Sequence, residues 1–189
     1  MKISAGQKVG YYVSYLSMDS APNFDWPSFN EPHAIKVKES PCISVKAFLS
    51  LYEKVGKNYE WTDQFLKGKE EVELFLGHES VKVFQLYFDM SLAGFFVLDF
   101  RINKICDLSY FGLISDYIGN GLGSYMLKYA ILTAWNGDIK KMLVNTNTLD
   151  HERALALYKK YGFQIIRVEK HTRILSNDRE TTEGVFLSK

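Results

Sequence analysis

The stretch Tyr117–Leu127, YIGNGLGSYML, decides how this sequence is interpreted. Its three glycines occupy every second position, between the apolar run Ile105–Ile114 and an amphipathic run with helical spacing. Such a turn exposes backbone N–H groups and opens onto a helix N-terminus, and both features favour a bound anion such as a phosphate. The stretch therefore predicts an anion-binding loop between a strand and a helix, although a tight turn alone could also use these glycines.

Length and composition set outer limits on the interpretation. The chain has 189 residues, of which 47% are hydrophobic and 24% charged, as in an ordinary globular protein. We expect a single domain over residues 1–189. The net charge of +1 predicts neither a nucleic-acid partner nor a membrane-surface partner.

The two cysteines, Cys42 and Cys106, show neither metal-ligand spacing nor a disulfide pattern, so we expect no bound metal. On its strand, Cys106 is expected to be a small buried hydrophobe rather than a nucleophile. The N-terminus has no apolar core of signal-peptide length, and no window is apolar enough to span a membrane. A cytoplasmic location is the expectation.

Apolar alternation, helical spacing and turn residues predict an α+β protein. Strands are expected at Val9–Met18, Val81–Asp89, Leu92–Arg101, Lys104–Ile114 and Met142–Asn147, with a closing pair of strands at Phe163–Leu175 and Gly184–Leu187. Helices are expected from Ser40-Pro41 to Gly56, in the region of Val72–Leu76, over Gly121–Trp135, and from a cap at Thr148 or Asp150 to Tyr161. Gly162 is the expected C′ residue, with Phe163 packing back onto the last turn.

The segment Asp19–His33 is expected to be irregular because it contains three prolines, Pro22, Pro27 and Pro32. Its aromatic residues indicate that it packs against something else. It could cover an edge of the core or form the wall of a substrate site.

Spacing excludes two kinds of phosphate-binding loop. A Walker A loop has the form Gly, four residues, then Gly-Lys-Ser/Thr. This chain has Ser124-Tyr125 where Gly-Lys would have to be. A dinucleotide fingerprint requires a third glycine where this chain has Ser124 or Met126.

A second motif, HERALALYKKYGF at residues 151–163, follows the glycine stretch after one intervening strand. Together with Gly121-Leu122-Gly123, this motif resembles the core signature of the GNAT superfamily of acetyl-coenzyme A-dependent N-acetyltransferases. The signature pairs a loop of form Arg/Gln-x-x-Gly-x-Gly/Ala with a helix of form Asn-x-x-Ala-x-x-x-Tyr-x-x-x-Gly-Phe. Three short segments also look similar to a bacterial subgroup of unknown substrate: Trp61-Thr62-Asp63, Tyr110–Leu113 and Thr148–His151.

The resemblance implies a single N-acetyltransferase domain with its core motifs in residues 81–170, and a mixed, mostly antiparallel sheet flanked by about four helices. It implies that acetyl-coenzyme A is the co-substrate, bound at Phe111, Leu113, Ile118, Gly119, Asn120, Gly121, Leu122, Gly123, Ser124 and His151. Two positions depart from the family pattern: Ile118 replaces the usual Arg or Gln, and His151 replaces the usual Asn. We expect weakened rather than lost cofactor binding, because backbone N–H groups and the helix dipole remain.

The resemblance also implies direct attack of an amine on the acetyl thioester. It places a backbone oxyanion donor on the strand near Phe111–Leu113, and Tyr158 as the acid that protonates the leaving thiolate. For the general base we expect Asp107, which strand alternation would place on one face with Phe111 and Leu113, with His151 as an alternative.

The acceptor site is expected to include Trp61, Asp63 and Asn145, and Asn147 could either bind substrate or end its strand. The expected partner is a small-molecule or peptide amine, with the protein acting as a monomer or homodimer. A non-catalytic coenzyme A sensor, or a partner-binding module on the same fold, is the alternative function, and Ile118 gives it some weight.

Overall fold

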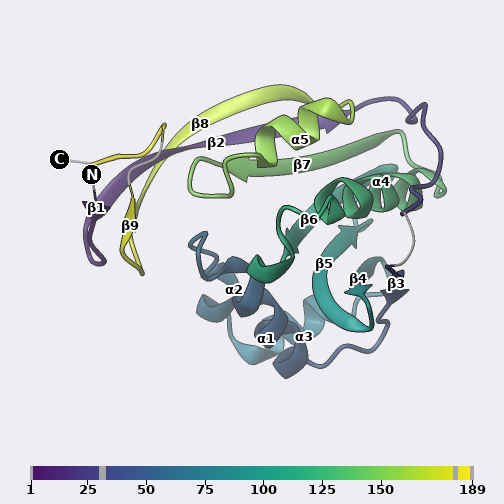
Figure 1. The fold of residues 1–189 in the computed structure, drawn as a ribbon, viewed down its shortest axis with the longest axis horizontal. Helices are drawn as coiled ribbons and strands as arrows, with labels where there is room; N and C mark the ends of the chain where they lie inside the picture. The colour runs from purple at the N-terminus through teal and green to yellow at the C-terminus, as the bar shows by residue number, and fades with distance from the viewer. Residues whose placement is uncertain (1, 30–32, 181–182, 188–189) are drawn as a thin grey trace.

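The computed structural model of the chain describes residues 2–29, 33–180 and 183–187. A large sheet runs through the molecule with helices on both of its faces, and a two-stranded sheet lies beyond it at one end (Figure 1). No helix in the described ranges is long and apolar enough to cross a membrane. The α+β expectation, with a mixed and mostly antiparallel sheet, is confirmed.

The strand order of the large sheet is β10-β2-β7-β6-β5-β4-β3. β8 also pairs with β2, along the edge opposite to the one that β7 and β10 share. All neighbours are antiparallel except β6 and β7, which are parallel. The strands are β2 (Lys8–Met18), β3 (Ile35–Glu39), β4 (Val81–Phe88), β5 (Ser91–Asp99), β6 (Ile105–Leu113), β7 (Lys141–Asn147), β8 (Gln164–Ile174) and β10 (Phe186–Leu187). The small sheet pairs β1 (Lys2–Ile3) with β9 (Arg179–Glu180).

Two hydrophobic cores fill the two faces of the large sheet. The first core lies under α4 (Leu122–Trp135) and α5 (Ala154–Lys160), and the second lies under α1 (Val45–Gly56) and α3 (Lys69–Leu76). The short α2 (Asp63–Leu66) is on the same face as α1 and α3 (Figure 1). A 3₁₀ turn, Ser115–Tyr117, leads from β6 into the glycine stretch.

Two helix starts differ from the sequence prediction. The first helix begins four residues later than expected, because Ser44 rather than Ser40 caps it: Ser44 Oγ accepts a 3.2 Å hydrogen bond from the N–H of Ala47. Ser40 instead donates its hydroxyl to Gln85 on β4. Neither Thr148 nor Asp150 caps α5, which begins at Ala154 without a side-chain cap.

The prediction that the two C-terminal strands pair with each other is also wrong. β8 and β10 do not pair with each other but lie on opposite edges of β2, which they both meet antiparallel. The long N-terminal strand thus holds the C-terminal strands in the sheet. The end of α5 agrees with expectation, because Gly162 adopts φ of +101° and Phe163 packs on Tyr158, with 5.9 Å between ring centroids.

The proline-rich segment Asp19–His33 is irregular wherever it is described, and its Pro32 lies outside the described residues. Phe24 and Phe29 pack against the first core, and Phe29 also contacts Tyr125 of α4 edge to face. The segment therefore covers an edge of the core.

A β-bulge in β6 shapes the centre of the sheet. Val97 of β5 pairs with Tyr110 and Leu98 pairs with Leu108, so Ser109 is the extra residue. Pairing of β6 with β7 is confined to 105–107 opposite 141–143. A bulge bends its strand, and β6 leaves β7 just where the bulge lies. The two strands separate beyond this point and leave a gap in the sheet.

Candidate active site

A cavity of about 630 Å³ occupies the gap between β6 and β7. At one end, called here the glycine-loop end, it is lined by Ile118, Gly119, Gly121, Gly123 and Ser124. At the other, called here the aromatic end, it is lined by Val55, Tyr59, Glu60, Trp61, Asp63 and Arg173. Residues 108–113 of β6, 145–147 of β7 and side chains from α5 and the loop before it complete the wall.

The free edge of β6 offers backbone donors to this cavity. The N–H of Ile114 donates to Ala93 O at 2.8 Å, on the β5 side. Since N–H directions alternate along a strand, the N–H groups of Phe111 and Leu113 point to the opposite side, where β7 has diverged. Gly112 serves a different purpose: a Cβ there would lie 2.3 Å from Val55 Cγ1, so the glycine lets α1 pack directly on β6.

The glycine stretch bends into α4 through two residues with positive φ, Gly119 at +97° and Gly121 at +77°. Gly121 is the N-cap of α4 and makes no side-chain cap. The first N–H groups of the helix therefore stay available for an anion at this end of the cavity. Eight of the ten positions expected to bind the cofactor line the cavity; Asn120 and Leu122 do not, and Leu122 is fully buried in the first core.

Tyr158 of α5 lines the cavity. Its side chain is buried, and its ring contacts Phe111 with 6.0 Å between centroids. Burial and the charge of Asp150 raise the pKa of Tyr158, so the hydroxyl keeps its proton at neutral pH. No residue in the described part of the chain hydrogen-bonds this hydroxyl, which leaves it able to donate to a ligand.

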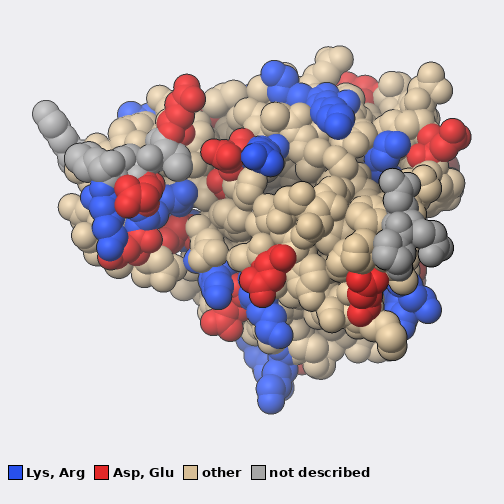
Figure 2. All heavy atoms as spheres, viewed as in Figure 1, with Lys and Arg blue, Asp and Glu red and all other residues tan. Residues whose placement is uncertain are grey.

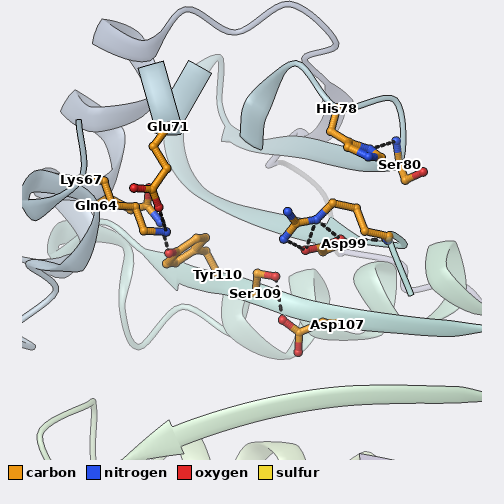
Figure 3. Close-up of polar contacts among 10 residues, drawn as sticks. Gln64, Lys67, Glu71, His78, Ser80, Asp99, Asp107, Ser109 and Tyr110 are labelled. Carbon is orange, nitrogen blue, oxygen red and sulfur yellow. Dashed lines mark hydrogen bonds and ion pairs between the residues drawn. The ribbon is translucent and has the colours of Figure 1, made fainter. Parts of the chain in front are cut away.

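Asp107 lies apart from these groups. The bulge at Ser109 reverses the alternation, so Phe111 and Leu113 face the first core while Asp107 is on the opposite face of β6; the expectation of one shared face is wrong. Asp107 accepts a 2.7 Å hydrogen bond from Ser109 (Figure 3) and is not among the cavity-lining residues. Burial raises the pKa of its carboxyl group.

A hydrogen-bonded group of aromatic residues and Asp63 supports the aromatic end. The Asp63 carboxylate accepts hydrogen bonds from the hydroxyls of Tyr52 and Tyr110, the latter at 2.8 Å. Gln64 donates its amide to the same Tyr110 hydroxyl (Figure 3). Trp61 packs on Tyr110 with 5.8 Å between centroids. Burial raises the pKa of Tyr110, which therefore remains a neutral donor.

Asp150 joins three segments at the cavity wall. Its carboxylate accepts from Trp61 Nε1 at 3.1 Å, from the Thr146 hydroxyl at 2.8 Å and from the Asn147 N–H at 2.9 Å. Asn147 in turn accepts from the N–H of Leu149 and so ends β7. Burial raises the pKa of Asp150, while these donors oppose that shift.

His151, predicted as a cofactor contact, and Asn145, predicted as a substrate contact, also line the cavity. The N–H of Arg153 donates to His151 Nδ1 at 3.2 Å, so this ring nitrogen is an acceptor. Tyr59 lies beside this ring, with 6.2 Å between centroids.

Sequence reasoning missed Glu60 and Arg173 and misjudged Asp150 as a helix cap. Glu60 is buried with φ of +62°, and its carboxylate accepts from the N–H groups of Ser176 and Asn177. Arg173 comes from β8, more than a hundred residues away in sequence. No local pattern links these positions, because the sheet alone brings them together. The strand that carries Arg173 also contains Arg167, Glu169 and Lys170, so no signal in the sequence singles Arg173 out.

The site offers little support for chemistry based on a metal ion or on a cysteine nucleophile. Within the described residues, no group of His, Cys, Asp and Glu side chains is arranged to hold a metal ion. Cys106 is buried in the first core, and burial raises the pKa of its thiol. Acidic and basic side chains are interspersed over the face seen in Figure 2.

Known proteins share features with this chain at the level of sequence motifs. A family model described as "Acetyltransferase (GNAT) family" matches residues 48–163. A sequence comparison with curated proteins finds no match.

Solved structures share the fold at low sequence identity. A protein of unknown function from Staphylococcus epidermidis ATCC 12228 is 11% identical with a TM-score of 0.59, over 89% of this chain and 62% of that one. A GCN5-related N-acetyltransferase from Kribbella flavida is 13% identical with a TM-score of 0.55, over 85% and 56%. A GNAT family acetyltransferase from Elizabethkingia anophelis, with acetyl-CoA bound, is 20% identical with a TM-score of 0.51, over 73% and 80%. The chain spans between 53% and 66% of the length of several such structures.

Proposed function

Because the chain belongs to the GNAT acetyltransferase family, we propose that it transfers the acetyl group of acetyl-coenzyme A directly to an amine. The observation that supports this most is the gap between β6 and β7, where backbone donors, the α4 N-terminus and Tyr158 line one cavity. Acetyl-coenzyme A would supply an activated acetyl thioester there. Its pyrophosphate fits the glycine-loop end, where positive-φ glycines leave backbone N–H groups uncovered.

The residues of the cavity meet two demands of acetyl transfer. The N–H groups of Phe111 and Leu113 are placed to donate to an oxygen that gains negative charge. The Tyr158 hydroxyl, protonated at neutral pH, is placed to protonate a departing thiolate, whose conjugate acid has a pKa of about 8.5.

The acceptor must lose its ammonium proton before attack. For a lysine-like amine this costs about 4–5 kcal/mol at pH 7. Of the two candidates for the base, His151 lines the cavity and is the better placed, and Asp107, which lies outside the cavity lining, is the alternative. Trp61, Asp63 and Asn145 are proposed to contact the acceptor.

Two measurements test the function. Calorimetric titration with acetyl-coenzyme A should show binding, and release of free thiol should follow when a panel of amines, amino acids, polyamines and aminoglycosides is added. Absence of binding would favour a partner-binding module. Binding without thiol release across the panel would favour a coenzyme A sensor, for which the replacement of the family's Arg or Gln by Ile118 is the motivating observation.

A further inference from the structure

Arg173 of β8 presents unused hydrogen-bond donors at the aromatic end. Its Nη2 donates to Thr62 Oγ1 at 2.8 Å and lies 3.5 Å from Glu60 Oε2, which fixes the guanidinium in place. Its Nε is buried without a partner, and Nη1 bonds to nothing among the residues that the structure describes. The side chain is 25% exposed and lines the cavity.

A second guanidinium, that of Arg179 on β9, also has unused hydrogen-bond donors. Its Nη2 donates to Leu149 O at 3.2 Å, while Nε and Nη1 are buried and have no hydrogen-bond partner among the described residues. Burial lowers the pKa of Arg179, and the neighbouring charge of Arg173 acts in the same direction. Buried polar groups in native proteins are nearly always hydrogen-bonded, so these donors call for an acceptor.

Glu60 and Asp150, the two carboxylates beside these arginines in the described part of the chain, do not supply that acceptor. Glu60 and Asp150 balance the charges of the two arginines, but their oxygens already accept from other groups. Five N–H donors on each guanidinium exceed what these contacts use. Glu60 and Asp150 thus balance the two arginines in charge but leave donors unused. Only Arg173 of the two arginines lines the cavity, where a ligand with acceptor oxygens could reach its donors.

A carboxylate fits better than a phosphate. The planar fork of Arg173 matches the two oxygens of a carboxylate. The acidic side chains of Glu60, Asp63 and Asp150 also lie at this end of the cavity, and they would repel a dianion more strongly than a monoanion.

We propose that the acceptor of this enzyme carries a carboxylate as well as its amine, as amino acids do, and that Arg173 binds the carboxylate at the aromatic end. The proposal rests on the proposed acetyl transfer. In it, Arg173 determines which amines are acetylated, while the reacting atoms lie further along the cavity near Tyr158 and β6.

Matched acceptor pairs test this specificity. Amino acids are compared with their decarboxylated amines, such as phenylalanine with phenethylamine and lysine with cadaverine, by thiol release. The kcat/KM of the acid member should exceed that of the amine by about tenfold or more. Arg173→Met should bring this ratio close to one, and Arg173→Lys should give an intermediate ratio. Arg167→Met, which removes an exposed arginine from the same strand, should keep the wild-type ratio.

A wild-type preference for the decarboxylated amines, or a ratio that survives Arg173→Met, would overturn the proposal. A uniform loss for both members of each pair would assign Arg173 a structural role only and also overturn it. If no amine is acetylated, the proposed function fails, and binding decides the carboxylate site separately. N-acetylphenylalanine should then bind more tightly than N-acetylphenethylamine by calorimetry in the wild type, and equal affinities would refute the site.

Discussion

Trp61 Nε1 donates a 3.1 Å hydrogen bond to Asp150 Oδ1, and this bond joins the loop after α1 to the loop after β7. The two loops lie on opposite sides of the gap between β6 and β7, where no backbone pairing holds the sheet together. The side-chain bond therefore connects the two sides of the gap, where backbone hydrogen bonds between β6 and β7 are missing.

Asp150→Asn should destabilise the fold by about 1–3 kcal/mol. The new amide N–H₂ group would face one of the donors whose hydrogen bonds the carboxylate now accepts. Urea unfolding at pH 7 measures this. Trp61→Phe should cost less in the Asp150→Asn background than in the wild type, with a coupling energy of about 1 kcal/mol. Trp26→Phe, which alters a tryptophan that is 48% exposed, serves as the control. Strictly additive effects of Trp61→Phe and Asp150→Asn would contradict the coupling.

Tyr158→Phe should lower turnover at least about tenfold while leaving the thermal unfolding midpoint nearly unchanged. The hydroxyl that is removed has no partner among the described residues, so the fold loses little. Tyr161→Phe, three residues further along α5's motif, is the matched control and should keep wild-type turnover. Since the pKa of Tyr158 is raised, the rate should not fall through its ionisation below about pH 10. Unchanged turnover in Tyr158→Phe would remove its assignment as the acid.

Gly121→Ala should weaken acetyl-coenzyme A binding and cost about 1–2 kcal/mol of stability, because φ at this position is +77°. Gly121→Asn should recover part of both losses, since asparagine tolerates this conformation better. Gly68→Ala is the control, with φ of −66° and nothing within 4 Å of an added Cβ. Calorimetry and urea unfolding give the two readouts. Equal behaviour of the alanine and asparagine variants would show that backbone conformation is not the cause.

Asp107→Asn should raise stability at pH 7. Burial raises the pKa of Asp107 in the folded state, so the folded protein binds this proton more tightly than the unfolded chain does. The tighter proton binding stabilises the folded state fully below the pKa of the unfolded chain, about 3.9. This stabilisation is lost as the pH rises through the pKa of Asp107 in the folded protein. The advantage of the variant should therefore shrink as the pH falls from 7 toward about 4, as measured by urea unfolding.

The same variant separates the two roles considered for Asp107. If this carboxylate is the general base, Asp107→Asn lowers thiol release by about a hundredfold or more at pH 7, whatever its stability. Higher stability with retained turnover would instead assign Asp107 to the sheet, in keeping with its place outside the cavity lining.

Local patterns in the sequence determined much of this protein. The alternating strand of β6, the glycines before α4 and the Gly162-Phe163 end of α5 each depend on neighbours in the chain, through backbone geometry and side-chain periodicity. The same motifs predicted the sheet class and placed most of the expected cofactor contacts on the cavity wall.

Tertiary structure decided the rest, because those features depend on which strands meet. The bulge at Ser109 exists only in the pairing of β6 with β5, and it moved Asp107 to the other face of its strand. The pairing of β8 with β2 brought Arg173 to Thr62 and Glu60 at the cavity. Strand pairing across more than a hundred residues leaves no local pattern in the chain. The glycine-loop end, together with Trp61 and Asp63 of the aromatic end, was therefore expected from the sequence, whereas the contacts of Arg173 emerged only from the fold.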